Sequence, residues 1–194
     1  RPVRCVQVGG PLGAYFPPSL FDTPFVGWVM RQTKQVRVDR ETGRAGEALV
    51  HAVRALEDGA CVVVYPEGSL TRDPDLWPMR GKSGAARLAL RSGAPVVPIA
   101  QWGPQDLLPP YAKVIRPSRR RQLMHVRFGP PVDLADLRGR PTTAKEVATA
   151  TDRIMQAITH ELEQLRGERA PTERFDPKAH GLRTTGDYRP GGSS

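Results

Sequence analysis

The chain has 194 residues, of which 39% are hydrophobic, and its formal net charge is +9. This length suits one domain with a sizeable core, and the charge favours a polyanionic partner: nucleic acid, an anionic membrane surface or a phosphorylated substrate. Two cysteines, Cys5 and Cys61, exclude a disulfide framework and a Cys/His zinc spacing. The chain also has no signal-peptide core and no apolar run of roughly 18 residues, so at a membrane we expect it to lie on the surface.

The first part of the chain gives weak signals. Residues 1–19 are rich in Gly and Pro without helical or strand period, so we expect an irregular N-terminal segment. Residues 20–30 form a short amphipathic stretch with Phe and Trp beside cations, which fits a core helix or an interfacial segment equally well. Gln35 to Asp39 alternates and predicts a short strand.

The next part has a βαβ pattern. Apolar residues recur at helical spacing from Ala45 to Leu56, and Gly59 supplies a stop. The run from Cys61 to Tyr65 is apolar without alternation, which predicts a strand buried on both faces, as in a parallel sheet. Strand, helix and buried strand succeed one another as in an α/β domain.

The α/β alternation continues after the Cys61 strand. A second helix is predicted from Lys82-Ser83-Gly84 to Arg91, and residues 94–100 predict a strand whose prolines suggest an end or an irregular edge. Leu123 to Phe128 is a further expected strand. These elements predict an α/β fold with a mostly parallel mixed sheet flanked by helices.

The C-terminal part separates into a long helix and a tail. Thr143 and Glu146 form a capping box for a helix that reaches Leu165. Residues 167–194 carry few apolar side chains and many Gly, Pro, Arg and Thr, so we expect a disordered tail. The expected domain therefore covers residues 20–166.

The junction after Tyr65 is a candidate site by position, because open α/β sheets bind ligands past the carboxyl ends of their strands. Pro66 ends the strand, and Gly68 lets the main chain approach a ligand. Glu67, Ser69, Thr71 and Arg72 add polar groups in a small space. A plain structural turn is the alternative interpretation of these residues.

Basic groups precede and follow this junction in the sequence. Arg40 ends the predicted Gln35 strand, Arg72 follows the turn, and Lys82 stands at the start of a predicted helix. A helix N-terminus with exposed amides is a ready anion site, and an Arg fork suits a phosphate. The set favours a phosphorylated ligand.

In this order the blocks resemble the glycerophospholipid acyltransferase family, specifically 1-acylglycerol-3-phosphate (lysophosphatidic acid) acyltransferases. The resemblance covers about residues 20–140. Leu20 to Trp28 is similar to the family's Leu-Phe-x-x-Pro-x-x-Gly-Trp stretch, and Tyr65 to Ser69 to its Phe-Pro-Glu-Gly-Thr block. The further matching blocks are Val38-Asp39-Arg40, Lys82-Ser83-Gly84 and Val97-Pro98-Ile99.

The resemblance implies a glycerol-3-phosphate-acyltransferase-like fold and the transfer of a fatty acyl group from acyl-CoA or acyl-carrier protein to 1-acylglycerol 3-phosphate, giving phosphatidic acid. It implies no cofactor and no metal, and a peripheral place on the cytoplasmic face of the cell membrane. Leu70 and Thr71 separate Ser69 from Arg72, whereas family members have the Arg directly after the Ser/Thr. The residues expected to bind the acceptor phosphate are Arg40, Glu67, Gly68, Ser69, Arg72 and Lys82.

One family motif is missing from the sequence. Family members use an upstream His-x-x-x-x-Asp pair, in which the His is the general base for the acceptor hydroxyl and the Asp orients it. No histidine of this chain has an Asp five positions on; the four are His51, His125, His160 and His180. We therefore expect no catalytic residue within this chain and little activity, with the motif encoded before Arg1.

Two other functions remain open at this stage. One is a non-catalytic lipid-binding remnant on the same scaffold. The other is nucleic-acid binding, suggested by the net charge and by Arg119-Arg120-Arg121. Since the chain has no RNP-like aromatics, helix-turn-helix pattern or zinc ligands, we expect no nucleic-acid partner. The same arginines suit anionic lipid headgroups.

Overall fold

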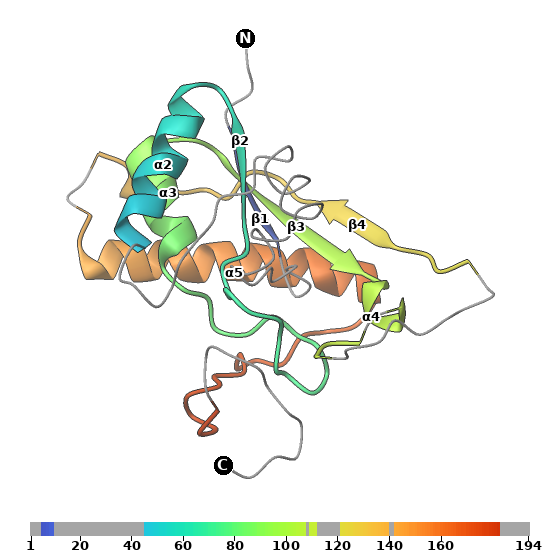
Figure 1. Cartoon of the computed structure of the whole chain (residues 1–194). Coiled ribbons are helices and arrows are strands. Elements are labelled where there is room, and N and C mark those ends of the chain that lie inside the picture. The colour runs from blue at the N-terminus through green and yellow to red at the C-terminus, as the bar shows by residue number, and fades with distance from the viewer. Residues whose placement is uncertain (1–4, 10–44, 108, 112–120, 140–141, 183–194) are drawn as a thin grey trace, which may run out of the picture.

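The computed structural model of the chain describes residues 5–9, 45–107, 109–111, 121–139 and 142–182. The predicted stretches at 20–30 and 35–39, and Arg40, lie outside these residues. In chain order, the elements (Figure 1) are β1 (Cys5–Gly9), α2 (Ala45–Glu57), β2 (Cys61–Val64), α3 (Gly84–Ser92), β3 (Val96–Trp102), α4 (Pro104–Leu107), β4 (His125–Phe128), the 3₁₀ helix η2 (Ala135–Leu137) and α5 (Ala144–Arg166).

The described strands form a four-stranded sheet in the order β2-β1-β3-β4. β1 is parallel to both β2 and β3, whereas β4 is antiparallel to β3. Val6 of β1 is opposite Val62 on one side and Val96 on the other. This arrangement confirms the predicted α/β fold with a mostly parallel mixed sheet.

The irregular segment expected over residues 1–19 is wrong for Cys5–Gly9, which is the strand β1 between β2 and β3. The Val6 side chain is fully buried, and its N–H donates to the Pro95 carbonyl at 2.8 Å. Five residues among glycines and prolines are too few to show a period. The strand is stabilised by partners about 55 and 90 residues away in the sequence.

Two expectations about individual strands are also corrected. β2 is not buried on both faces. Its side chains alternate, so Val62 and Val64 pack on the core, while Cys61 and Val63 point to the other face and are exposed. β3 is an inner strand despite its prolines. Pro98 has no N–H to donate, but its carbonyl accepts the Gly129 N–H at 2.9 Å.

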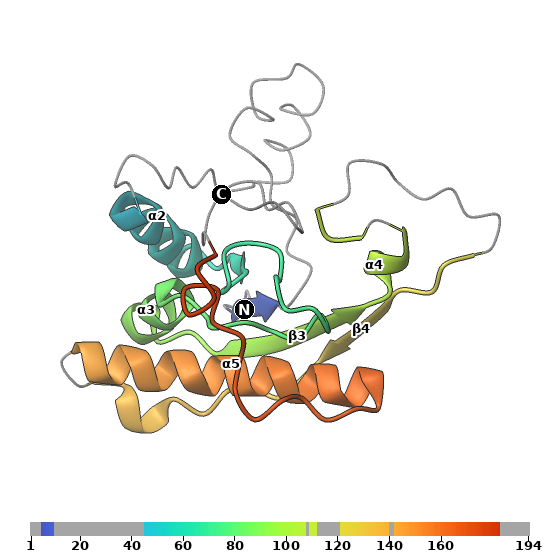
Figure 2. The ribbon, with the colours of Figure 1, turned by 90° about the horizontal axis from the view of Figure 1, so that it is seen from below.

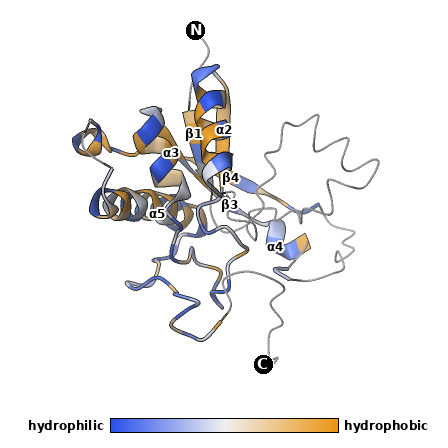
Figure 3. Cartoon of the chain, turned by 60° about the vertical axis from the view of Figure 1, so that its left-hand side comes forward, coloured by the Kyte–Doolittle hydropathy of each residue, from blue (hydrophilic) through white to orange (hydrophobic). Residues whose placement is uncertain are grey.

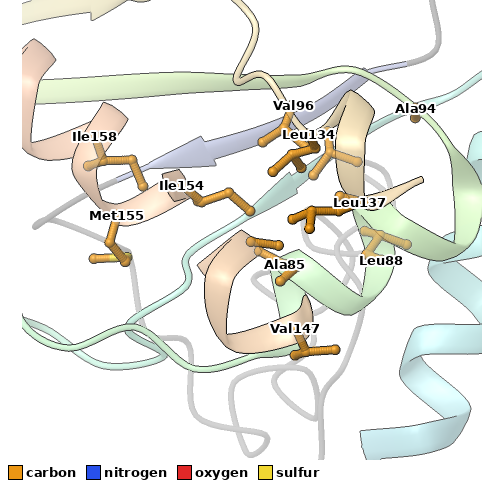
Figure 4. Packing of buried hydrophobic residues seen from close by; sticks show 14 of the residues in the cluster. Ala85, Leu88, Ala94, Val96, Leu134, Leu137, Val147, Ile154, Met155 and Ile158 are labelled. Carbon is orange, nitrogen blue, oxygen red and sulfur yellow. The ribbon is translucent and has the colours of Figure 1, made fainter. Parts of the chain in front are cut away.

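The predicted helices are confirmed, and they share one core with the sheet. α2 contacts β2, α3 contacts β1, and α5 lies along β3 (Figure 2). Each helix has a hydrophobic and a hydrophilic side (Figure 3), which is why one face can be buried. Figure 4 shows part of this core, in which Val96 of β3, Ala85 of α3 and Ile154 of α5 belong to one buried cluster.

Local signals fix the helix ends as the sequence predicts. Gly93 adopts the left-handed conformation (φ 64°), and its N–H donates to the Ala89 carbonyl. Thr143 accepts the Glu146 N–H with its side chain at the start of α5. These caps use residues three or four positions apart, which makes them visible in the sequence.

The disordered tail expected from residue 167 is wrong for residues 167–182, which fold back along the loop after β2 (Figure 1). The Arg80 N–H donates to the Phe175 carbonyl at 3.1 Å, and its guanidinium bonds to Asp176 at 3.1 Å. Phe175 also stacks on His180 at 4.4 Å. A low apolar content therefore conceals specific contacts with the body of the domain.

Candidate functional site

A tight turn follows β2 at the carboxyl end of the parallel strands. The Gly68 N–H donates to the Tyr65 carbonyl at 3.0 Å, and Gly68 has φ 68°, which favours glycine. The Pro66 carbonyl accepts the Lys82 N–H at 2.8 Å. Residues 66–82 therefore form a loop whose two ends are joined, so that the turn lies against the residues that precede α3.

The Glu67 side chain points into this loop. It is 5% exposed, and its Oε2 accepts the Met79 N–H at 3.0 Å. Burial raises the pKa of Glu67 from its ordinary value of 4.5 to about 8, against the opposing effect of the Met79 N–H, and nearby Asp73 raises it further. Near neutral pH the carboxyl is mostly protonated. An anion close to the turn therefore meets little repulsion from Glu67.

Arg72 lies inside the loop as well. It is 5% exposed, and its N–H approaches the Met79 sulfur at 3.1 Å. Its Nε donates to the Tyr111 hydroxyl at 3.3 Å, and that hydroxyl donates to the Leu70 carbonyl at 2.8 Å. Met79 thus contacts both Glu67 and Arg72. The neighbouring Tyr111 ties Arg72 to the chain that follows α4.

The middle of the loop is held by its own polar groups. The Thr71 hydroxyl donates to the Trp77 carbonyl at 2.8 Å, and the Asp73 carboxylate accepts the Trp77 N–H at 3.2 Å. Leu76 has φ 62°, which is uncommon for a residue with a side chain. The backbone on both sides of Arg72 is therefore fixed by specific hydrogen bonds.

A cation between two indole rings attaches the loop to the rest of the fold. The Arg166 guanidinium lies 4.0 Å from the Trp77 ring centre and 4.4 Å from that of Trp102. It also donates to the Asp75 carbonyl at 2.6 Å. We call these three residues the Trp-Arg-Trp clamp. It joins the loop to the ends of α5 and β3.

The start of α3 completes the site. Lys82 is exposed, and Ser83 makes no side-chain capping bond to the helix. No acidic residue occurs in the first turn of α3. The first amides of a helix have no partner within the helix and carry partial positive charge. This helix end and Lys82 together favour an anion.

The structure brings five of the six predicted phosphate-binding residues into one loop: Glu67, Gly68, Ser69, Arg72 and Lys82. The sixth, Arg40, lies outside the described residues. Glu67 and Arg72 point inward, whereas Lys82 is exposed. Their roles toward a phosphate remain predictions.

The four histidines are exposed side chains on separate elements: His51 on α2, His125 on β4, His160 on α5, and His180 beyond α5. His160 lies 3.8 Å from Glu163, and the ring nitrogen Nδ1 of His180 is 3.0 Å from the Asp176 carbonyl oxygen. The described contacts include no hydrogen bond between a histidine and an aspartate carboxylate.

Sequence reasoning missed Tyr111, Arg166 and Asp176 as neighbours of the loop. Tyr111 is 39 residues from Arg72, and Arg166 is 91 residues from Asp75. Asp176 is 96 residues from Arg80. No local spacing points to such contacts; the two tryptophans beside a loop of polar residues are the one feature that could have suggested an aromatic attachment.

Comparison with known families bears directly on this loop. Residues 15–102, which include β2, the turn and α3, match the family model described as Acyltransferase. Through this segment, the chain is similar to the acyltransferase family. The acyltransferase match ends at the last residue of β3.

Curated relatives carry one activity in their names. The chain is 33% identical over 92 residues to a chloroplastic 1-acyl-sn-glycerol-3-phosphate acyltransferase of Brassica napus, which covers 47% of this chain and 26% of that protein. It is 28% identical over 161 residues to a 1-acyl-sn-glycerol-3-phosphate acyltransferase of Pseudomonas aeruginosa, covering 77% of this chain and 60% of that protein. The chain thus spans about a quarter of the plant relative.

A solved structure supports the fold. The crystal structure of the 1-acyl-sn-glycerophosphate acyltransferase PlsC from Thermotoga maritima superposes with a TM-score of 0.55 at 19% identity. The match covers 88% of this chain and 70% of that chain. The acyltransferase fold expected from the sequence is therefore shown. Among the helices that the structure describes, none is both long and apolar enough to cross a bilayer.

Proposed function

We propose that this chain forms the acceptor-binding part of a 1-acylglycerol-3-phosphate O-acyltransferase. In the reaction, the free hydroxyl of the acceptor attacks the thioester carbonyl of acyl-CoA or acyl-carrier protein. The C–S bond breaks, an ester C–O bond forms, and the hydroxyl proton passes through a base to the thiolate. The products are phosphatidic acid and the free thiol. The relatives' names support this choice of acceptor.

One observation carries the proposal. Residues 66–82 form a closed loop that adjoins the N-terminus of α3, at the carboxyl end of the parallel strands. The Glu67 carboxyl inside that loop is mostly neutral near pH 7, because burial raises its pKa to about 8. A phosphate at the turn would meet the helix amides and Lys82 without repulsion from Glu67.

We assign different tasks to the residues of the loop. Gly68 and Ser69 provide the closest backbone and a hydroxyl for the phosphate, and Lys82 provides an exposed charge. Arg72 contributes its charge from inside the loop, where the lower dielectric strengthens the attraction. Glu67 orders the loop through Met79 rather than contacting the phosphate. Arg40 is assigned to the same phosphate by its family block.

The chain Arg1 to Ser194 is expected to turn over slowly by itself, because it contains no His-x-x-x-x-Asp pair. Holding the acceptor hydroxyl in place supplies a large part of the rate, but the proton still needs a base. We propose that a form carrying the motif before Arg1 is active at the cytoplasmic face of an anionic membrane. Acyl-CoA and acyl-carrier protein both remain as donors.

The missing motif also favours a second candidate, a non-catalytic lipid-binding protein with the same loop. An assay of thiol release from acyl-CoA separates the two. The chain as it stands is compared with a longer chain that carries the genomically encoded residues before Arg1. We expect turnover from the longer chain alone; rapid turnover by the short chain would contradict our assignment of the base. Failure of both chains to turn over, with lysophosphatidate still bound, would favour the second candidate.

A further inference from the structure

β4, an outer strand of the described sheet, and the two residues directly before it expose large apolar side chains. Leu123, Met124, Val126 and Phe128 are 74%, 53%, 51% and 60% exposed. We call these four residues the β4 strip. Exposed large apolar side chains on an outer strand are an aggregation hazard that proteins usually avoid. Their exposure here points to a binding partner that covers them.

The two faces of β4 differ in chemistry. Arg127 points toward α5, where its Nε donates to Glu161 at 2.6 Å. Because successive side chains of a strand alternate, Val126 and Phe128 point to the opposite face. Figure 1 shows β4 at the border of the molecule, far from α2 and α3. The described helices therefore leave these two side chains uncovered.

The strip begins at the same edge of the sheet as the candidate site. β2 and β3 run parallel to β1, so both end at one edge, where the loop at residues 66–82 begins. β4 runs the opposite way, and its first residue, His125, is opposite Trp102, the last residue of β3. Leu123 and Met124 therefore lie at the edge that carries the proposed phosphate site.

Positive charge accompanies the strip. Arg121 is exposed just before it, and the sequence places Arg119 and Arg120 next to Arg121. Apolar side chains beside arginines suit the boundary between anionic headgroups and acyl chains. We propose that the β4 strip docks the protein on an anionic lipid surface, with the acceptor loop at the same edge. This inference rests on the proposed function for its choice of a lipid partner.

Flotation with lipid vesicles tests the inference without an activity measurement. The full chain is mixed with vesicles of phosphatidylcholine alone or of phosphatidylcholine with phosphatidylglycerol. We expect binding to the anionic vesicles, and a loss of roughly tenfold or more in the partition coefficient for the Val126→Ser, Phe128→Ser double variant, from the apolar area it removes. Met124→Gln, which lies before the paired part of β4, should reduce binding in the same direction.

The chain offers a matched control at the other side of the sheet. Val50 and Val63 are 45% and 52% exposed, on α2 and β2. The Val50→Ser, Val63→Ser variant should bind vesicles like the wild type. An equal loss in both double variants, or equal binding to neutral vesicles, would overturn the inference.

Self-association is the competing explanation, and light scattering distinguishes it. A dimer that dissociates in the Val126→Ser, Phe128→Ser variant would assign the strip to a second copy and overturn the lipid assignment. A monomer with vesicle binding that depends on the strip supports the inference, even if acyl transfer is absent. The docking surface and the proposed function can therefore fail separately.

Discussion

Glu67 has an unusually high pKa for a carboxyl group. It lies within the loop, bonds to the Met79 N–H and has a pKa raised to about 8 by burial. In the unfolded chain the same group loses its proton near its ordinary value of 4.5. The folded state thus binds more protons than the unfolded state between these two values. Stability should therefore fall as the pH rises from about 5 to 8.

Glu67→Gln should flatten this dependence. The amide oxygen can still accept the Met79 N–H, but the side chain no longer loses a proton. We expect the variant to gain stability relative to the wild type as the pH rises, by up to a few kcal/mol above pH 8. The melting temperature measured at several pH values provides the check, with exposed Glu173→Gln as control. Parallel curves for wild type and Glu67→Gln would refute the assigned pKa.

Tyr111 holds Arg72 through a single oxygen. Tyr111→Phe removes the acceptor for the Arg72 Nε and the donor to the Leu70 carbonyl. We expect a loss of about 1–3 kcal/mol in the free energy of unfolding, measured with denaturant. Tyr65→Phe is the control, because it removes the same hydroxyl group from a residue that precedes the turn. A negligible effect of Tyr111→Phe would mean that Arg72 does not depend on this contact.

At the scale of elements, the loop after β2 is stabilised by parts of the chain that are distant in sequence. α5 contributes Arg166, β3 contributes Trp102, and residues 167–182 contribute the contacts to Arg80. The fold thus fixes the loop from both sides before any ligand binds. Such preorganisation lowers the ordering cost of binding a phosphate.

The Trp-Arg-Trp clamp can be tested by Arg166→Met. The variant keeps much of the side-chain volume but loses the charge over both rings and the bond to the Asp75 carbonyl. We expect a loss of about 2 kcal/mol in stability and faster hydrogen exchange at residues 75–79. Arg153 is on the same helix as Arg166, and Arg153→Met, which removes an exposed pair with Asp136 of η2, should have a smaller effect. Unchanged exchange in Arg166→Met would contradict the clamp.

The segment 167–182 makes a second prediction at this scale. A chain that ends at Gly167 loses the contacts of Phe175 and Asp176 with Arg80, whereas a chain that ends at Leu182 keeps them. We expect a lower melting temperature for the shorter chain than for the longer one. Equal melting temperatures would mean that residues 168–182 do not stabilise the domain.

The elements held by contacts between residues close in sequence could be predicted, whereas those held by distant residues could not. α2, α3 and α5 were predictable because their period and caps depend on residues three or four apart, as at Thr143 and Glu146. β1 was not, because its five residues are stabilised by β2 and β3. At the candidate site, the motif predicted that Glu67 and Arg72 lie close to the turn after β2, and both lie in the loop that follows it. Tyr111 and Arg166 could not be predicted, since they reach the loop through the tertiary fold.

At the scale of the molecule, two features lie at one edge of the sheet. The loop at residues 66–82 and the start of β4 lie at the carboxyl end of the parallel strands, and the net charge of +9 favours an anionic surface. A lipid acceptor embedded in such a surface would present its phosphate near the headgroups. The site and the docking surface would then face the same layer of the membrane.

The most direct test of the phosphate site is the binding of a soluble phosphate acceptor, because it needs no catalytic base. Isothermal titration of the full chain with a short-chain lysophosphatidate is compared with titration of the matching monoacylglycerol, which lacks the phosphate. We predict binding of the lysophosphatidate alone, with an affinity reduced roughly tenfold or more in Arg72→Gln or Lys82→Gln and unchanged in Arg153→Gln. Equal affinity for the two lipids, or equal losses in all three variants, would contradict a phosphate site in the loop after β2.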